Sequence, residues 1–118
     1  MIAVIFEVWP AAGRKTDYLD IAAALRADLT KIDGFISVER FQSLSDPNKL
    51  LSLSFWHDEN AVKKWRNNSS HRESQIKGRA GIFANYRLRI AATIRDYGMN
   101  ERAEAPADSL GIHDRPRP

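Results

Sequence analysis

Residues 2–9, with the sequence IAVIFEVW, are apolar at almost every position, and Glu7 carries the only charge. Successive side chains of a strand point to opposite faces, so this segment places one apolar set on each face of a sheet. The sets are Ile2, Val4, Phe6 and Val8 on one face, and Ala3, Ile5 and Trp9 on the other. The segment therefore predicts a strand whose two faces must both be covered.

The next segments change from a helical to a strand period. Apolar residues recur every three or four positions over residues 16–32, which predicts an amphipathic helix that Thr16 caps and Gly34 ends. Residues 35–43 and 50–57 alternate as strands, and the SDPNK turn between them predicts a hairpin.

A second helix and a last strand complete the pattern. Asp58 is expected to cap the helix, which an Asn-Asn pair at residue 67 interrupts before a further helical segment runs to about residue 77. Glycines then mark a loop, and residues 84–96 alternate as a long strand. The order βαββαβ predicts an α+β, ferredoxin-like antiparallel sheet with both helices on one face.

Helices on one face leave the other face of this sheet open. Phe35 and Phe41 are expected on one side of the second strand, opposite Ile36 and Val38, so both sides of that strand also carry apolar residues. Pairing of two sheets across this face would cover it. We therefore expect a homodimer, with the two sheets enclosing a barrel-like core.

The chain of 118 residues suits one domain, which we place at residues 1–98. Residues 99–118 are polar, rich in Pro and Ala, and without apolar periodicity, so we expect an extended or disordered C-terminal tail. Leu110 and Ile112 are the tail residues that could dock on a partner subunit.

Composition excludes several classes of protein. The chain has no cysteine, which rules out disulfides, thiolate nucleophiles and iron–sulfur ligation. The histidines His57, His71 and His113 include no pair at i, i+4 spacing, so we expect no metal site.

The charge pattern and the hydropathy narrow the class further. A net charge of +3, with basic residues scattered among acids, does not favour nucleic-acid binding. No apolar run approaches the ~20 residues of a membrane span, and the N-terminal run lacks the basic start and cleavage site of a signal peptide. We therefore expect a cytoplasmic protein without a membrane contact.

The entry to the second helix carries the pattern F-W-x-(D/S)-x-x-A-x-x-x-W, here formed by Phe55, Trp56, Asp58, Ala61 and Trp65. With His71 in the next helical segment and a last strand over residues 86–97, the chain resembles the antibiotic biosynthesis monooxygenase (ABM) family of dimeric α+β barrels. The resemblance covers roughly residues 1–98.

The resemblance implies a cofactor-independent monooxygenase acting on a small aromatic or quinol-like molecule held between sheet and helices, without metal or flavin. A base deprotonates the substrate in a dry pocket, and the anion reacts directly with oxygen. Two alternatives stay open. One is a haem-binding or haem-degrading protein, whose Trp is matched by Trp65, although Gln75 stands nearer than His71 to the axial ligand and Glu7 replaces an Asn. The other is a non-catalytic binding or stress-response module.

Two residues are candidate catalytic bases. His71 has the ionisation range of a general base at neutral pH, or it is a surface histidine at a helix start. Glu7 breaks an apolar strand, so its carboxylate either faces a pocket with a raised pKa or pairs with Arg40 or Arg89.

Five residues are candidate substrate contacts. Trp65 is a core aromatic that could also form a pocket floor, and Trp56 belongs either to the pocket or to the dimer interface. Arg72, Gln75 and Arg79 share one helical side, where they would orient a substrate or remain solvated.

Overall fold

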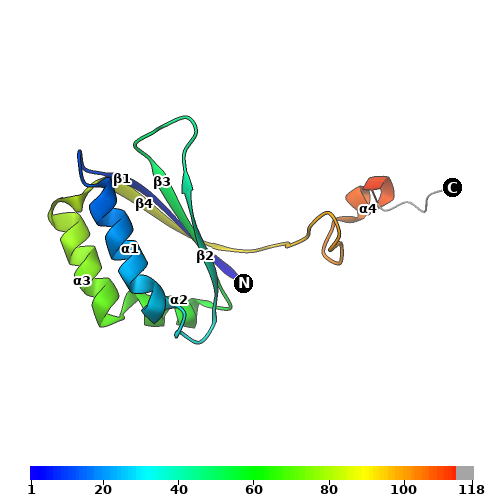
Figure 1. The fold of residues 1–118 in the computed structure, drawn as a ribbon. Coiled ribbons are helices and arrows are strands. Elements are labelled where there is room, and N and C mark those ends of the chain that lie inside the picture. Colours follow the sequence, from blue (N-terminus) through cyan, green and yellow to red (C-terminus); the bar gives the residue numbers. More distant parts are fainter. Residues whose placement is uncertain (114–118) are drawn as a thin grey trace.

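The computed structural model describes residues 1–113 and contains one four-stranded antiparallel sheet with helices on one face (Figure 1). The strands lie in the order β2-β3-β1-β4. This arrangement confirms the predicted ferredoxin-like class. The elements are β1 (Ile2–Pro10), α1 (Lys15–Leu29), β2 (Phe35–Gln42), β3 (Leu50–Trp56), α2 (Glu59–Arg66), α3 (Ser69–Lys77), the π-helical turn η1 (Gly78–Ile82), β4 (Phe83–Ala92) and α4 (Ala107–His113).

The helix-facing side of the sheet holds two apolar clusters. Val8, Tyr18, Leu50 and Ile82 form the first cluster, against which Phe6 and Phe83 pack. The second cluster is built around Trp56, which is fully buried, and joins α2 to the sheet. The even-numbered apolar residues of β1 therefore serve the monomer core, and the odd-numbered ones point to the opposite side.

Helix ends follow local hydrogen bonds more than apolar periodicity. The prediction that Thr16 caps α1 is wrong, because the amide of Tyr18 bonds the carbonyl of Arg14 and the helix begins at Lys15 without a side-chain cap. The helix ends at Leu29 instead of residue 32. Asp58 does cap α2, since its Oδ1 accepts a hydrogen bond of 2.9 Å from the amide of Ala61.

A bulge in β2 changes the expected faces of that strand. Phe35 pairs with Trp56, whereas Ser37 pairs with Phe55, so Ile36 is the extra residue. Phe35 consequently packs in the helix-side cluster with Val38, while Phe41 lies on the other face. The prediction that Phe35 and Phe41 share a face is therefore wrong.

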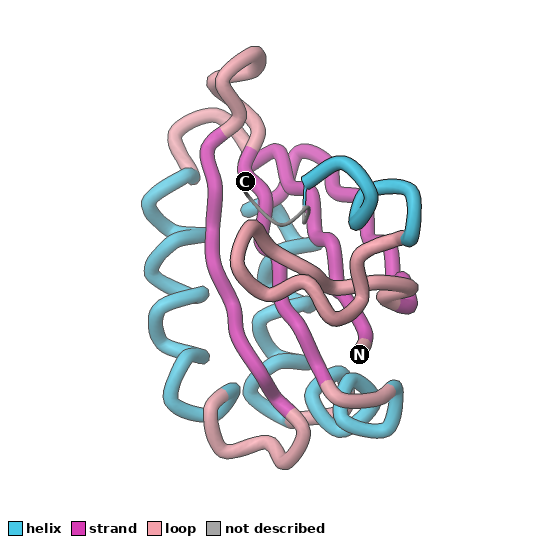
Figure 2. Tube along the Cα trace, turned by 90° about the vertical axis from the view of Figure 1, so that its right-hand side faces the viewer, coloured by secondary structure: helices cyan, strands magenta, loops and turns pink. Residues whose placement is uncertain are grey.

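The uncovered face of the sheet stays as predicted, apolar and without helices. Ile5, Leu53 and Phe55 lie there on neighbouring strands, and Phe41 is 41% exposed at the edge. Figure 2 looks onto this face and shows the strands in front of the helices. Among the segments drawn, only C-terminal ones lie between the strands and the viewer.

The last strand and the C-terminal segment differ from expectation. β4 ends at Ala92, four residues before the predicted end, and the chain then leaves the body of the fold (Figure 1). Ala107–His113 is helical, so an extended or disordered tail is wrong for that part, while residues 114–118 lie outside the described residues. Leu110 and Ile112 are exposed on α4. Within residues 1–113, no helix has both the length and the apolar character needed to cross a membrane.

Candidate functional site

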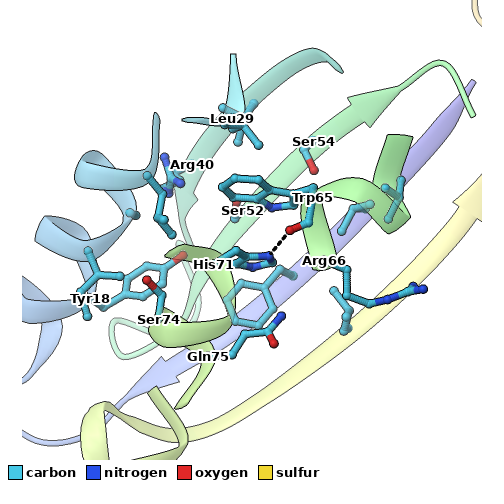
Figure 3. Close-up of a pocket in the computed structure, with 18 of the residues that line it drawn as sticks. Tyr18, Leu29, Arg40, Ser52, Ser54, Trp65, Arg66, His71, Ser74 and Gln75 are labelled. Carbon is cyan, nitrogen blue, oxygen red and sulfur yellow. Dashed lines mark hydrogen bonds between the residues drawn. The ribbon is translucent and has the colours of Figure 1, made fainter. Parts of the chain in front are cut away.

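A cavity of about 220 Å³ lies between the helix-facing side of the sheet and helices α1, α2 and α3. Most of its lining is apolar, including Phe6 and Val38 from the sheet and Leu25 from α1. Figure 3 shows the polar residues among this lining. They are Tyr18, Arg40, Ser52, Ser54, Arg66, His71, Ser74 and Gln75.

The cavity exists because β3 turns small side chains toward the helices. Ser52 and Ser54 occupy the positions where a core strand ordinarily carries a branched apolar residue, and both line the cavity. Ser54 is fixed in place, because its Oγ accepts a hydrogen bond of 2.9 Å from Nε1 of the buried Trp56. The small and partly polar side of this strand, visible in the sequence, is thus the floor of the cavity.

His71 is positioned by the start of α3. The Oδ1 of Asn68 caps this helix by accepting a hydrogen bond of 3.2 Å from the His71 amide. The imidazole lies flat against the Trp65 indole, with ring centroids 4.4 Å apart and planes at 13°. Its Nδ1 lies 3.0 Å from the carbonyl oxygen of Trp65 (Figure 3).

These contacts determine the tautomer of His71. A carbonyl oxygen only accepts hydrogen bonds, so Nδ1 carries the proton and the neutral ring has its lone pair on Nε2. Burial lowers the pKa of His71 below its ordinary 6.5, and the nearby charge of Arg72 acts in the same direction, while the bond to Trp65 opposes it. A neutral imidazole with an accepting Nε2 is the state that a general base requires.

Trp65 combines the two roles considered for it. Its indole packs in the cluster of Trp56, at 6.5 Å between ring centroids, and also lines the cavity. Trp56 lies behind it, fully buried and outside the cavity lining. Trp56 therefore supports the wall without forming its surface.

The three polar residues predicted on one helical side separate in the structure. Gln75 lines the cavity. Arg72 is exposed and donates hydrogen bonds to Gln75 (3.0 Å) and Asn67 (2.9 Å) outside it. The turn η1 takes Arg79 out of the α3 register, and Arg79 instead donates a hydrogen bond of 3.0 Å to the Tyr86 hydroxyl. Neither arginine belongs to the cavity lining.

Glu7 lies on the uncovered face of the sheet, so the expectation that its carboxylate faces the pocket is wrong. It forms ion pairs with Lys49 at 2.6 Å and with Arg89 at 2.7 Å. The hydrogen bond from Lys49 lowers the pKa of Glu7, with the charges of Lys49 and Arg89 acting in the same direction against desolvation. The ion pair with Arg89 confirms the alternative expectation, that Glu7 pairs with an arginine of a neighbouring strand. The second ion pair, with Lys49, was not predicted.

Sequence reasoning missed the polar residues that α1 and β2 bring to the cavity. Tyr18 falls within the helix that apolar periodicity predicts over residues 16–32, and burial raises the pKa of its hydroxyl while Arg40 acts in the opposite direction. Arg40 was considered only as a partner of Glu7, and it lies on the other face of the sheet. Among residues 1–113, no cluster of three or more His, Asp or Glu side chains could hold a metal ion.

A family model and one curated relative indicate the same family. Residues 1–76 match the family model described as antibiotic biosynthesis monooxygenase. The jasmonate monooxygenase ABM of Pyricularia oryzae is 45% identical over 101 residues, which cover 86% of this chain and 47% of that protein. The uncharacterized protein YqjZ of Bacillus subtilis is 27% identical over 62 residues, covering 52% of this chain and 53% of that protein. The chain thus spans about half the length of these curated relatives.

A solved structure extends the likeness to the fold. Rv0793 from Mycobacterium tuberculosis superimposes with a TM-score of 0.74 at 13% sequence identity, covering 82% of this chain and 98% of that one. At this identity the match concerns the fold alone.

Proposed function

Because the chain belongs to the antibiotic biosynthesis monooxygenase family, we propose that it oxidises a small aromatic or quinol-like molecule in the cavity, without metal or flavin. The observation that carries this proposal is His71, whose neutral ring lines an apolar cavity with Nδ1 engaged and Nε2 left as the acceptor. The substrate is a ring compound with an acidic O–H or C–H bond.

The reaction requires no external reductant. Nε2 of His71 accepts a proton from the substrate, and the resulting electron-rich anion transfers electrons to O₂ and forms a C–O bond with it. The hydroperoxide loses water to give a carbonyl. A methylene group is thus oxidised by four electrons, O₂ is reduced by four, and one oxygen atom enters the product while the other leaves as water.

The surroundings of His71 favour this step. Apolar side chains exclude water from the anion, and the Trp65 indole holds the imidazole in one plane. Gln75 is held by Arg72 and offers an amide at the cavity wall. Trp65 and Gln75 are thus proposed substrate contacts.

The haem alternative fits this site less well. The cavity of about 220 Å³ is smaller than the roughly 300–1,000 Å³ of pockets that hold drug-sized ligands, and a haem is larger than most of these.

The uncovered sheet face supports a homodimer as the working form. Ile5, Leu53 and Phe55 form an apolar strip there, and pairing with a second copy would remove it from water. The cytoplasmic location expected from the sequence stays a prediction.

Oxygen uptake tests the proposed reaction. Dithranol, a phenolic anthrone, serves as the quinol-like substrate, and jasmonate serves as a second one because of the name of the fungal relative. With ¹⁸O₂, we expect one labelled oxygen in the product and the other in water. His71→Phe keeps an aromatic ring on Trp65 but removes the base, so kcat should fall by about 10²–10⁴-fold.

The matched control is Lys77→Gln, a change at an exposed residue of the same helix outside the cavity lining, which should retain most activity. Binding of both compounds without oxygen uptake would instead identify a non-catalytic binding module and overturn the proposal. Equal rates for wild type and His71→Phe would remove His71 from its role as base.

A further inference from the structure

The charge inside the cavity is of one sign. The side chains that line it include the cations Arg40 and Arg66, whereas no Asp or Glu belongs to the described lining. Arg66 is exposed and extends away from the cavity, while Arg40 lies on its other side beside Tyr18 (Figure 3). Arg40 is therefore the cation that faces a ligand in the interior.

Arg40 differs from Lys49 and Arg89 in forming no ion pair with an acid among the described residues. Lys49 and Arg89 both pair with Glu7 on the uncovered face. Arg40 is half-buried, and its Nε is inaccessible to solvent and without a hydrogen-bond partner among residues 1–113. A buried guanidinium donor that lacks a partner costs free energy, so a ligand that supplies an acceptor gains affinity.

Further donors surround this guanidinium. Arg40 on β2 pairs in register with Ser52 on β3, whose hydroxyl lines the same part of the cavity. The hydroxyl of Tyr18, contributed by α1, lies next to Arg40. Arg, Ser and Tyr side chains can all donate to one anion, and a planar guanidinium suits a carboxylate because it donates two parallel hydrogen bonds.

We propose that Arg40 anchors a carboxylate, so that the natural ligand is a small amphipathic acid with its charged end at Arg40 and Ser52 and its apolar body along Trp65. This assignment rests on the proposed function for the identity of the site and adds the substrate class. Because the anchor fixes one end of the molecule, it also selects which carbon reaches His71.

A pair of matched compounds tests the anchor without requiring turnover. The dissociation constants of 4-phenylbutyrate and 4-phenylbutan-1-ol, which share an apolar body, are measured by tryptophan fluorescence in wild type and in Arg40→Gln. Trp65→Phe assigns the signal to the cavity. We expect wild type to bind the acid about 10-fold to 100-fold more tightly than the alcohol, as is typical of charge-assisted hydrogen bonds.

Arg40→Gln should abolish this preference by weakening the acid alone, and Arg40→Lys should restore part of it because the charge returns without the fork. Arg66→Gln is the control, since it removes an exposed arginine of the same lining. Equal affinities of wild type for the two compounds would overturn the proposal. The proposal would also be overturned if Arg66→Gln lost the preference for the acid over the alcohol while Arg40→Gln kept it.

A thermal melt of each variant separates loss of binding from loss of fold, and Tyr18→Phe gives a second measurement if Arg40→Gln does not fold. Because Tyr18→Phe removes one hydroxyl donor, it should lower the affinity for the acid several-fold and leave the affinity for the alcohol unchanged. An unchanged affinity for the acid would count against the anchor. The proposals fail separately. Acid binding through Arg40 without oxygen uptake refutes the reaction alone, and undiminished uptake of a carboxylate substrate by Arg40→Gln refutes the anchor alone.

Discussion

Gly78 packs against an aromatic ring so closely that a single added methyl group must move it. The backbone of Gly78 is helical, with φ −58° and ψ −50°, so alanine meets no backbone strain there. Its Cβ would lie 2.3 Å from Cε2 of Phe83 and 2.6 Å from Cζ. Ordinary carbon contacts begin near 3.5 Å, so the ring must shift by about 1 Å.

Two opposing contributions set the size of this effect. Overpacking of a well-packed site costs about 1–3 kcal/mol, whereas Gly→Ala at a compatible backbone position returns about 0.4–1 kcal/mol by restricting the unfolded chain. Gly78→Ala should therefore lower the free energy of unfolding by up to about 2.6 kcal/mol. In a Phe83→Ala background the aromatic ring is absent, so Gly78→Ala should raise the free energy of unfolding by about 0.4–1 kcal/mol.

Urea unfolding of the four proteins of this cycle, followed by circular dichroism at one protein concentration, measures the sign change. Gly98→Ala is the control, because its Cβ meets no atom within 4 Å, and it should stay within about 0.5 kcal/mol of wild type. Phe83 also lines the cavity, so Gly78→Ala should change the affinity for 4-phenylbutyrate. Equal effects of Gly78→Ala in both backgrounds would refute the steric reasoning.

Three further predictions concern the site and the assembly. Because burial lowers the pKa of His71, the rate of oxygen uptake should stay at its plateau at pH 6.5 and decline only in more acidic buffer. The free energy of unfolding should also decline below pH 6.5, because the unfolded chain takes up the proton more readily than the folded protein. The variant His71→Phe should show neither decline. Haemin should give no Soret shift that depends on His71, since the cavity of about 220 Å³ is too small for a haem, and a shift abolished by His71→Ala would contradict this. Phe55→Glu should produce monomers in sedimentation analysis with secondary structure retained, and an unchanged mass would count against pairing through the sheet face.

The order of elements was predictable because each segment carries its own period. Alternation over residues 2–9 and 50–57 indicates strands without tertiary information, and Asp58 places a cap by local chemistry alone. The bulge at Ile36 was not predictable in this way, because an extra residue interrupts the period without leaving a turn or glycine signal.

The site residues on helices were predictable from the sequence, whereas the sheet face on which a strand residue lies was not. Trp65, His71 and Gln75 follow from the helical segments after β3, and all three line the cavity. Arg40 and Glu7 each stand in an alternating strand, and which face a strand turns toward the helices depends on packing far away in sequence. The sequence therefore left open which face these two residues occupy, and the structure has Arg40 on the helix-facing side and Glu7 on the uncovered side.

The serines on the inner side of β3 link the range of accepted ligands to the stability of the protein. Ser54 is committed, because any residue without an acceptor oxygen would leave the Trp56 indole N–H buried without a partner. Ser52 is not needed to satisfy a buried donor of the core in this way. A larger apolar residue at this position would fill part of the cavity and add to the packed core. Relatives that differ at this one position can therefore exchange breadth of substrate for resistance to heat, with the rest of the fold unchanged.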